Sequence, residues 1–303
     1  MKTLRLGTRG SALALVQTDI VIRTLVAHHP TLKDRIEIVP IKTTGDTIVD
    51  RSLTDLGGKS LFTKEIEMAL EMKDIDIAVH SMKDVTADVP KGLVFPAMLE
   101  REDPRDALIT RDGRLLEDFP EGAVFGTSSL RRQAHVMKKY PQFKVANLRG
   151  NVPTRLSKIM EGEFDATLLA VAGLKRLDML DKATQVLSID EFLPAVAQGA
   201  LGIQCREDDA STLELLRPLN HLSTFQAVSA ERAFMRDLNG SCRTPIAGFA
   251  YIEGNHLFFK GMISEPEGHN MHFISHSGPS NEPEKIGSEA AALIKKQSCQ
   301  TFS

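Results

Sequence analysis

The chain has 303 residues, enough to bury a substantial core but more than one ordinary domain needs, so we expect two or three domains. Its formal net charge of -3 argues against a general attraction to nucleic acid, and no run of about 18 apolar residues predicts a membrane span. The stretch MKTLRLGTRGSALAL lacks the apolar core of a signal peptide because Arg5 and Arg9 interrupt it, so we expect a cytoplasmic protein. Three cysteines are too few to indicate a disulfide framework.

The first two thirds of the chain alternate short apolar runs with helical patterns, which is typical of an α/β fold built on largely parallel sheets. The expected elements are strands at 4–6, 36–41, 75–79 and 123–125, and helices at 12–25 and 61–72. GTSSLRR after the fourth strand repeats the Gly-Thr start of GTRGS after the first, and LSKIMEGEFDATLLAV resembles IEMALEMKDIDIAVHS. These repeats predict two similar α/β lobes, and the charged segment 100–107 between them has the composition of a hinge.

After PAVAQGALGIQC the pattern changes to that of a small α+β domain. Ser223 and Gln226 form a capping-box pattern that predicts a helix start, and Gly240 suits the end of that helix. The runs 246–252 and 256–262 flank a Gly-Asn turn and predict a hairpin. A further strand near 272–275 and a final helix around 284–296 complete this domain.

Polar and basic side chains collect in the loops after predicted strands, where open parallel sheets form their binding crevice. Any one of these cations is most simply a solvated surface charge, but their recurrence in equivalent loops predicts a cleft for a ligand with several carboxylates or phosphates. The segment 127–132 also coincides with a predicted helix N-terminus, whose free N–H groups favour an anion. The set comprises Thr8, Arg9, Ser11, Ser81, Lys83, Thr127, Ser128, Ser129, Arg131, Arg132, Arg149, Arg155, Lys175 and Arg176.

Asp84 is an acid among these cations, and two interpretations of it stand side by side. It is either a proton donor or stabiliser of a transient cation, or a structural partner of Lys83 or an arginine. His80 ends a predicted strand, and a single histidine there is more often a hydrogen-bonded structural residue than a base.

Cys242 follows the predicted helix end in LNGSCRTP, and three explanations for its thiol compete. Burial is the commonest fate of a free cysteine, but a loop beside Arg243 is a poor burial site. A zinc ligand would need a CxxC motif or a nearby histidine pair, and neither is present. A thiolate favoured by Arg243 is nucleophilic or carries a covalent group. Cys205, in an apolar run, is expected in the core, and Cys299 has no indicated role.

Over nearly its whole length the sequence resembles the porphobilinogen deaminase family, also called hydroxymethylbilane synthases. The resemblance rests on several motifs in one order: GTRGSALAL, GGKSLFTKE, DIAVHSMKDV, EREDPRDA, GTSSLRRQ, LRGNVPTRL, AVAGLKRL, PAVAQGALGI and NGSCRTPIAG. It implies a monomeric transferase of haem and tetrapyrrole biosynthesis. Such an enzyme condenses four porphobilinogen molecules head to tail, with loss of ammonia, and then releases hydroxymethylbilane by hydrolysis.

The resemblance also implies a fold and a set of site residues. Two lobes like those of periplasmic binding proteins, 1–99 with 200–217 and 105–193, would precede a C-terminal α+β domain at 220–303. Cys242 would hold a dipyrromethane cofactor through a thioether, with Asp84 as catalytic acid/base, and no metal, nucleic acid or membrane is implied. The residues implied to bind the cofactor are Lys83, Asp84, Thr127, Ser129, Arg131 and Arg132, and those implied to bind substrate are Arg9, Ser11, Lys59, Arg149, Arg155 and Arg176.

Several positions depart from the family pattern without removing a catalytic group. Ser60 and Ser241 stand where glycine is common, Arg243-Thr244 replaces Gln-Val, and Ala197 replaces a glycine before Gln198. We expect Ser60 to stiffen the Lys59 loop and Ala197 to restrict the chain crossing. The alternatives from other classes are a noncatalytic anion-binding module, which leaves Asp84, Cys242 and the third domain unexplained, and a thiol-redox protein, which lacks a CxxC motif.

Overall fold

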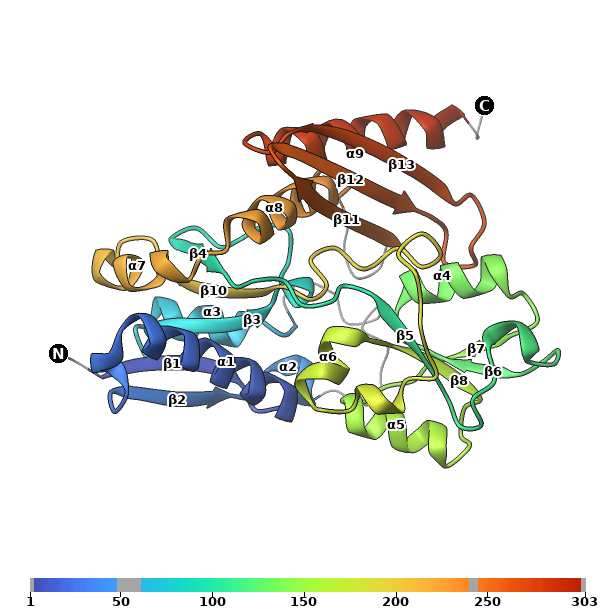
Figure 1. Cartoon of the computed structure of the whole chain (residues 1–303), viewed down its shortest axis with the longest axis horizontal. Helices are drawn as coiled ribbons and strands as arrows, with labels where there is room; N and C mark the ends of the chain where they lie inside the picture. Colours follow the sequence, from blue (N-terminus) through green and yellow to red (C-terminus); the bar gives the residue numbers. More distant parts are fainter. Residues whose placement is uncertain (1–2, 48–60, 240–244, 301–303) are drawn as a thin grey trace. The chain divides into compact units, whose positions relative to one another are not determined.

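The computed structural model describes residues 3–47, 61–239 and 245–300, and the chain divides into two compact units (Figure 1). The first unit contains a five-stranded sheet in which β1 pairs in parallel with β2 and β3, while β10 runs antiparallel between β3 and β4. In sheet order the strands are β2 (Ile36–Ile41), β1 (Leu4–Arg9), β3 (Ile77–Ser81), β10 (Leu201–Arg206) and β4 (Leu93–Met98).

Helices cover both faces of this sheet. Strand alternation sends Ile77 and Val79 to one face, where they share a core with α1 (Ala12–His28) and α7 (Ala210–Leu216). Ala78 points to the other face, into a core with Ile66 and Leu70 of α3 (Lys64–Glu71). The short helices of the unit are η1 (Pro30–Leu32), α2 (Thr44–Thr47), η2 (Met82–Asp84) and η5 (Arg217–Leu219).

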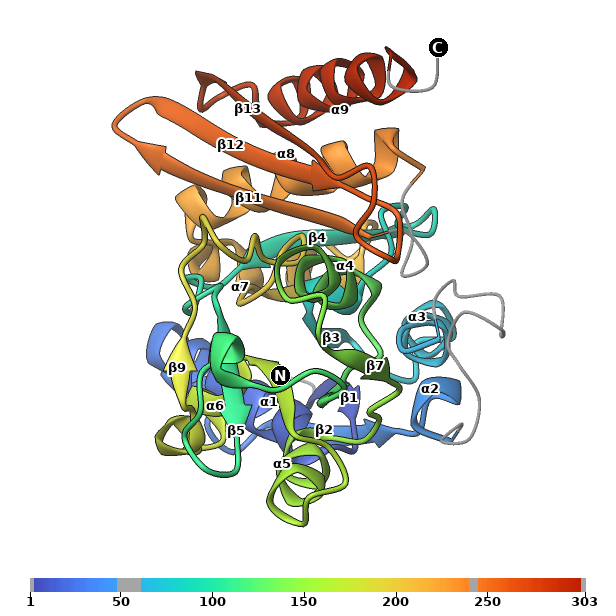
Figure 2. The same cartoon turned by 90° about the vertical axis from the view of Figure 1, so that its right-hand side faces the viewer.

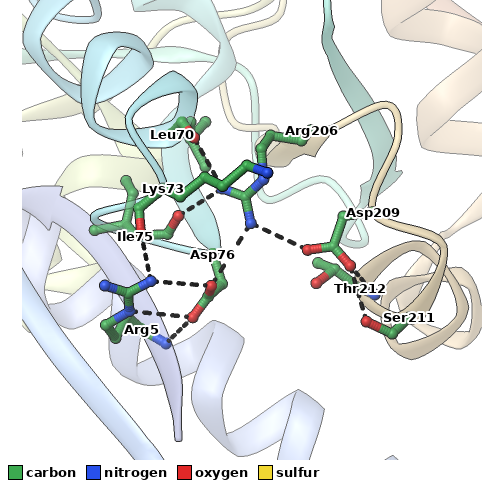
Figure 3. Close-up of polar contacts among 9 residues, drawn as sticks. All are labelled: Arg5, Leu70, Lys73, Ile75, Asp76, Arg206, Asp209, Ser211 and Thr212. Carbon is green, nitrogen blue, oxygen red and sulfur yellow. Dashed lines mark hydrogen bonds and ion pairs between the residues drawn. The ribbon is translucent and has the colours of Figure 1, made fainter. Parts of the chain in front are cut away.

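A network of charged side chains fixes the returning strand β10 at the amino-terminal edge of β1 and β3 (Figure 3). Arg206 is largely buried and donates to the carbonyl oxygens of Leu70 and Ile75 at 2.8 and 2.7 Å. Its guanidinium also lies 3.0 Å from Asp209 and 3.6 Å from Asp76, and Asp76 in turn accepts hydrogen bonds from Arg5. The network therefore ties a distant part of the sequence to the first lobe.

The second unit contains a sheet of the same design. β6 pairs in parallel with β7 and β8, and β5 runs antiparallel between β8 and β9. In sheet order the strands are β7 (Lys144–Ala146), β6 (Val124–Gly126), β8 (Ala166–Ala170), β5 (Asp106–Thr110) and β9 (Gln185–Val186). The pattern of parallel and antiparallel pairs matches that of the first sheet over all five strands, which confirms the prediction of two similar α/β lobes.

Helices again cover both faces of the second sheet. α4 (Leu130–Lys139) packs its Val136 with Phe125 on one face, while α5 (Val152–Met160) and α6 (Val171–Arg176) pack on the other through Leu156, Ile159 and Leu174. The remaining short helices of this lobe are η3 (Leu116–Asp118) and η4 (Leu180–Lys182).

The C-terminal part of the second unit is a small antiparallel sheet with two helices (Figure 2). Its strands are β11 (Ile246–Glu253), β12 (His256–Ile263) and β13 (His272–Pro279). Its helices are α9 (Pro283–Gln300) and α8 (Leu222–Asp237), of which the residues from Gln226 onward belong to this unit. The rings of Phe234 on α8 and Phe259 on β12 lie 4.8 Å apart. Gly287 brings α9 against α8, because a Cβ there would collide with the Ala230 carbonyl oxygen. The predicted small α+β domain is confirmed.

Most predicted elements are present, and the differences have local causes. α8 begins at Leu222, one residue before the predicted cap, because the His221 ring accepts a hydrogen bond from the Thr224 amide and leaves Ser223 exposed in the first turn. The segment 100–107 is only partly a connection, since Asp106 and Ala107 already belong to β5 and are fully buried. Cys205 is buried in the first core as predicted, whereas Gly240 lies outside the described residues.

Candidate active site

The loops after β1 and β3 lie at the same edge of the first sheet because these strands are parallel neighbours. A small pocket that opens to solvent lies at this edge. Its lining residues are Arg9, Ser11, Leu13, Ala14, Gln17, Phe62, Thr63, Val79, His80, Ser81 and Asp84. The structure thus brings together Arg9, Ser11 and Asp84, which the sequence places in the loops after two predicted strands.

Arg9 is the central cation of this pocket. Its Nε donates to both carboxylate oxygens of Asp46 at 3.2 and 3.3 Å, and one terminal nitrogen also binds that carboxylate. The other terminal nitrogen lies 3.8 Å from Oδ2 of Asp84, and the guanidinium stacks 4.3 Å from the centre of the Phe62 ring. Arg9 therefore approaches Asp84 while its charge is already shared with Asp46.

Asp46 and Phe62 were missed by the sequence analysis. Burial raises the pKa of Asp46, but hydrogen bonds from Arg9 and Thr43 outweigh that effect and lower it below the ordinary value. Gly45 makes room for the ring, because a Cβ there would collide with Phe62. No local motif signals these contacts, since Asp46 is 37 residues from Arg9.

Asp84 ends the short helix η2 directly after β3, and its side chain is 36% exposed. Beside it, Ser81 is fixed by reciprocal hydrogen bonds with the buried Gln17 amide at 2.8 and 3.1 Å. His80 is buried in β3 with its ring edge-on to Phe95, while Lys83 is exposed. The carboxyl group of Asp84 is thus accessible to a ligand and surrounded by side chains that other contacts hold in place.

In the second lobe, the carboxyl ends of the parallel strands β6, β7 and β8 carry the other predicted residues. Ser129 caps α4 by accepting a hydrogen bond from the Arg132 amide, and Thr127 accepts one from the Ser129 amide at 3.0 Å. Ser128 donates to Asn147 and to the Leu148 carbonyl oxygen. Side chains of this loop therefore already accept hydrogen bonds from the Ser129 and Arg132 amides, and these contacts hold the loop before α4 in place.

Arg131 and Arg132 lie in the first turn of α4 and are both buried around one carboxylate. Arg131 donates to Oδ2 of Asp106 at 2.7 Å, Arg132 donates to Oδ1 at 2.7 Å, and Arg131 also donates to the Leu193 carbonyl oxygen. Burial raises the pKa of Asp106, but the two guanidinium groups outweigh that effect and hold it well below the usual range. Two arginines against one aspartate leave one net positive charge in this buried cluster.

The histidine beside this cluster adds no further positive charge. Burial, reinforced by Arg131, lowers the pKa of His135 to about 3, so its ring is neutral at physiological pH. The Nε atoms of Arg131 and Arg132 are buried and have no hydrogen-bond partner among the described residues. A buried donor without a partner is costly, so the cluster is suited to an anionic ligand. Asp106 was not selected from the sequence, although it lies in the EREDPRDA motif.

The remaining predicted residues of the second lobe are spread over separate elements. Arg155 lies on α5 and donates to the Gly150 carbonyl oxygen at 2.8 Å, Arg149 lies half-buried between β7 and α5, and Arg176 ends α6. Lys59 and Cys242, together with Ser60, Ser241 and Arg243, lie outside the described residues. Within the described part of the chain, no helix is long and apolar enough to cross a membrane.

Two family models match the sequence, and together they span most of it. The model described as porphobilinogen deaminase, dipyromethane cofactor binding domain, matches residues 4–214. The model described as porphobilinogen deaminase, C-terminal domain, matches residues 225–296.

Two relatives illustrate the degree of similarity. The chloroplastic porphobilinogen deaminase of Oryza sativa subsp. japonica is 52% identical over 280 residues, which cover 91% of this chain and 78% of the relative. The porphobilinogen deaminase of Nitrobacter hamburgensis is 47% identical over 297 residues, which cover 98% of this chain and 94% of the relative.

Among solved structures, a substrate-binding domain of a putative amino acid ABC transporter from Streptococcus pneumoniae matches with a TM-score of 0.44 and 14% identity. The match covers 72% of this chain and 91% of that structure. A periplasmic binding protein from Salmonella typhimurium matches with a TM-score of 0.39 and 15% identity, covering 72% of this chain and 92% of the other.

Proposed function

The chain belongs to the porphobilinogen deaminase family, and we propose that it condenses four porphobilinogen molecules head to tail with loss of ammonia, then releases hydroxymethylbilane by hydrolysis. It is accordingly a transferase of tetrapyrrole biosynthesis, and residues 4–214 form a domain of the type that binds dipyrromethane. That cofactor supplies the pyrrole ring to which the first substrate is joined. The tasks left to the chain's own residues are to bind carboxylates and to move protons.

The observation that carries the proposal is the pairing of an accessible carboxyl group with a held cation in one pocket. Asp84 lies 3.8 Å from Arg9, and both line the pocket at the ends of β1 and β3. The reaction requires a group that assists departure of ammonia, stabilises positive charge on a pyrrole nitrogen and accepts a proton from a ring carbon. Asp84 has the chemistry for these tasks, and we assign it the role of catalytic acid/base.

The second lobe supports the assignment of a cofactor with carboxylate side chains. Arg131 and Arg132 retain one net positive charge and two buried Nε donors without partners in the described part of the chain, which suits a carboxylate rather than a neutral group. We assign to the cofactor the side chains of Lys83, Asp84, Thr127, Ser129, Arg131 and Arg132. Cys242 is assigned as its point of covalent attachment, because the resemblance in NGSCRTPIAG gives this otherwise unexplained thiol a role.

Substrate carboxylates need further cations, since each porphobilinogen carries an acetate and a propionate. We assign Arg9, Ser11, Lys59, Arg149, Arg155 and Arg176 to this task. The stacking of Arg9 on Phe62 and its contacts with Asp46 support its assignment, because a guanidinium that is already oriented loses less conformational freedom when it binds.

Domain limits, location and oligomeric state extend the proposal. We infer domains at 1–99 with 200–217, at 105–193 and at 220–303, supported by the separate sheets of the described residues, whose strands fall within these limits. We further infer a cytoplasmic monomer, and size-exclusion chromatography with light scattering tests the second part of that inference.

The experiment that tests the function is turnover of porphobilinogen by the purified chain. The expected products are four ammonia molecules for each hydroxymethylbilane. Asp84→Asn is expected to keep fold and cofactor yet lower turnover by about 10²–10⁴-fold, the range for a general acid/base, while Asp88→Asn at an exposed neighbouring site retains it. Near wild-type turnover by Asp84→Asn would refute the role of that residue, and no turnover by the wild-type chain would refute the function.

A further inference from the structure

The arginine pair of the second lobe is held by a carboxylate that has a third polar partner. The amide of Gln198, which is only 1% exposed, donates to Oδ1 of Asp106 at 3.0 Å. The same amide nitrogen donates to the Pro104 carbonyl oxygen at 2.7 Å. Asp106 therefore receives Arg131 on one oxygen, and both Arg132 and Gln198 on the other.

The backbone that carries Gln198 is itself fixed from the C-terminal sheet and helix. The fully buried carboxylate of Glu231 on α8 accepts hydrogen bonds from the Ala197 amide at 2.6 Å and from the Ala250 amide on β11 at 2.8 Å. The Gly248 amide donates to the Pro194 carbonyl oxygen at 3.1 Å. Ala197 holds a left-handed backbone with φ of 60°, a conformation that persists in a non-glycine residue only where its surroundings impose it.

From this chain of contacts we propose that Gln198 is a positioning residue for anion binding. Its amide sets the orientation of the Asp106 carboxylate, and Asp106 sets the positions of the Arg131 and Arg132 guanidinium groups. This inference rests on the proposed function, in which these arginines bind cofactor carboxylates.

Gln198 can position the two arginines because only a few contacts fix the rotation of the Asp106 carboxyl group. A carboxylate shared by two guanidinium groups keeps both at 2.7 Å only while each oxygen stays directed at its own arginine. The two donors on Oδ1 oppose rotation about the terminal side-chain torsion, which is otherwise a broad one. Loss of the Gln198 amide would let Asp106 turn, so that the net positive charge remains but its location becomes less defined.

Gln198→Glu gives a test that separates positioning from general stability. Burial and the charge of Asp106 would raise the pKa of the introduced carboxyl group, whereas Arg131 and Arg132, which bind the same Asp106 carboxylate, would lower it. When it is protonated it can still donate to Asp106, and when it is ionised it repels Asp106. The effect of this variant on binding is therefore expected to grow with pH, whereas Gln198→Met, which has no titrating group, is expected to show a loss that does not depend on pH.

The matched control is Gln142→Glu, because the Gln142 amide also donates to a carbonyl oxygen of the same lobe, that of Leu116, and not to Asp106. The readouts are the fraction of purified chain that carries a covalent mass increment, and the KM for porphobilinogen at pH 6.5 and 8.5. For Gln198→Glu we expect a reduced loaded fraction and a KM raised about tenfold at pH 8.5, as for loss of one hydrogen bond to a charged group, with recovery toward wild type at pH 6.5.

Full loading and a KM within twofold of wild type at both pH values, in Gln198→Glu and Gln198→Met alike, would overturn the inference. So would a change in Gln198→Glu equal to that in Gln142→Glu. If Gln198→Glu does not fold, as judged by circular dichroism, Gln198→Met decides by its loading and KM. A wild-type chain with neither increment nor turnover would instead refute the proposed function.

Discussion

Asp209→Asn tests how the returning strand β10 is fixed to the first lobe. Asp209 caps α7 by accepting hydrogen bonds from Ser211 and from the Thr212 amide, and it also accepts one from Arg206 at 3.0 Å. Burial raises the pKa of Asp209, but these hydrogen bonds outweigh it and lower the pKa from 3.8 to about 2. The substitution keeps the shape of the side chain and removes its charge.

The magnitude follows from the two pKa values. Because the folded-state pKa lies below the unfolded value, the carboxylate stabilises the folded protein above pH 3.8 and loses that effect as the pH falls through 2. A difference of nearly two pH units corresponds to about 2 kcal/mol at pH 7, and to roughly half of that near pH 3. The side chain is 22% exposed, so solvent screening reduces this value only in part.

The assay is urea unfolding of wild type, Asp209→Asn and the control Asp208→Asn, whose side chain is exposed, followed by circular dichroism at several pH values. The midpoint of Asp209→Asn is expected to fall at pH 7, and its difference from wild type is expected to shrink by roughly half near pH 3. Equal midpoints at pH 7, or a difference that stays constant with pH, would show that the charge of Asp209 does not anchor this region.

Two further changes test the pocket and the C-terminal packing. Asp46→Asn removes the anion that orients Arg9. We expect the KM for porphobilinogen to rise about tenfold in steady-state kinetics, while the melting temperature changes little. An unchanged KM would contradict the role given to Asp46. Gly287→Ala places a Cβ against the Ala230 carbonyl oxygen, so α9 must shift. Calorimetry is expected to show that the free energy of unfolding falls by about 1–3 kcal/mol. An unchanged melting temperature would contradict the close packing of α8 and α9.

The fold could be predicted from the sequence where neighbouring residues alone determine the local structure. The hairpin of β11 and β12 follows from two apolar runs around Gly254, which adopts φ of 60° in the turn. The repeated Gly-Thr ends of β1 and β6 predicted two lobes, and the strand pairings agree. The boundary of α8 was less predictable, because a histidine ring rather than the usual serine caps its first turn.

The candidate site was predictable only for residues in recognisable loops. Arg9, Ser11 and Asp84 follow strands that a parallel sheet brings together, so their meeting in one pocket was foreseeable. Asp46 and Phe62 reach Arg9 in the pocket of the first lobe, and Asp106 reaches Arg131 in the second lobe, through tertiary contacts over 25 or more residues, and such contacts leave no spacing signal. At Ala197 the sequence departs from the family pattern, in which glycine is common. The alanine adopts the left-handed backbone conformation that glycine adopts more easily.

Attachment of dipyrromethane to Cys242 is tested by comparing the intact mass of the purified wild-type protein with that of Cys242→Ser. A covalent increment equal to two linked pyrroles is expected in the wild-type chain, and none is expected in the variant. A wild-type chain without an increment, made in a host that synthesises porphobilinogen and still unmodified after porphobilinogen is added, would show that Cys242 carries no dipyrromethane and is an ordinary thiol.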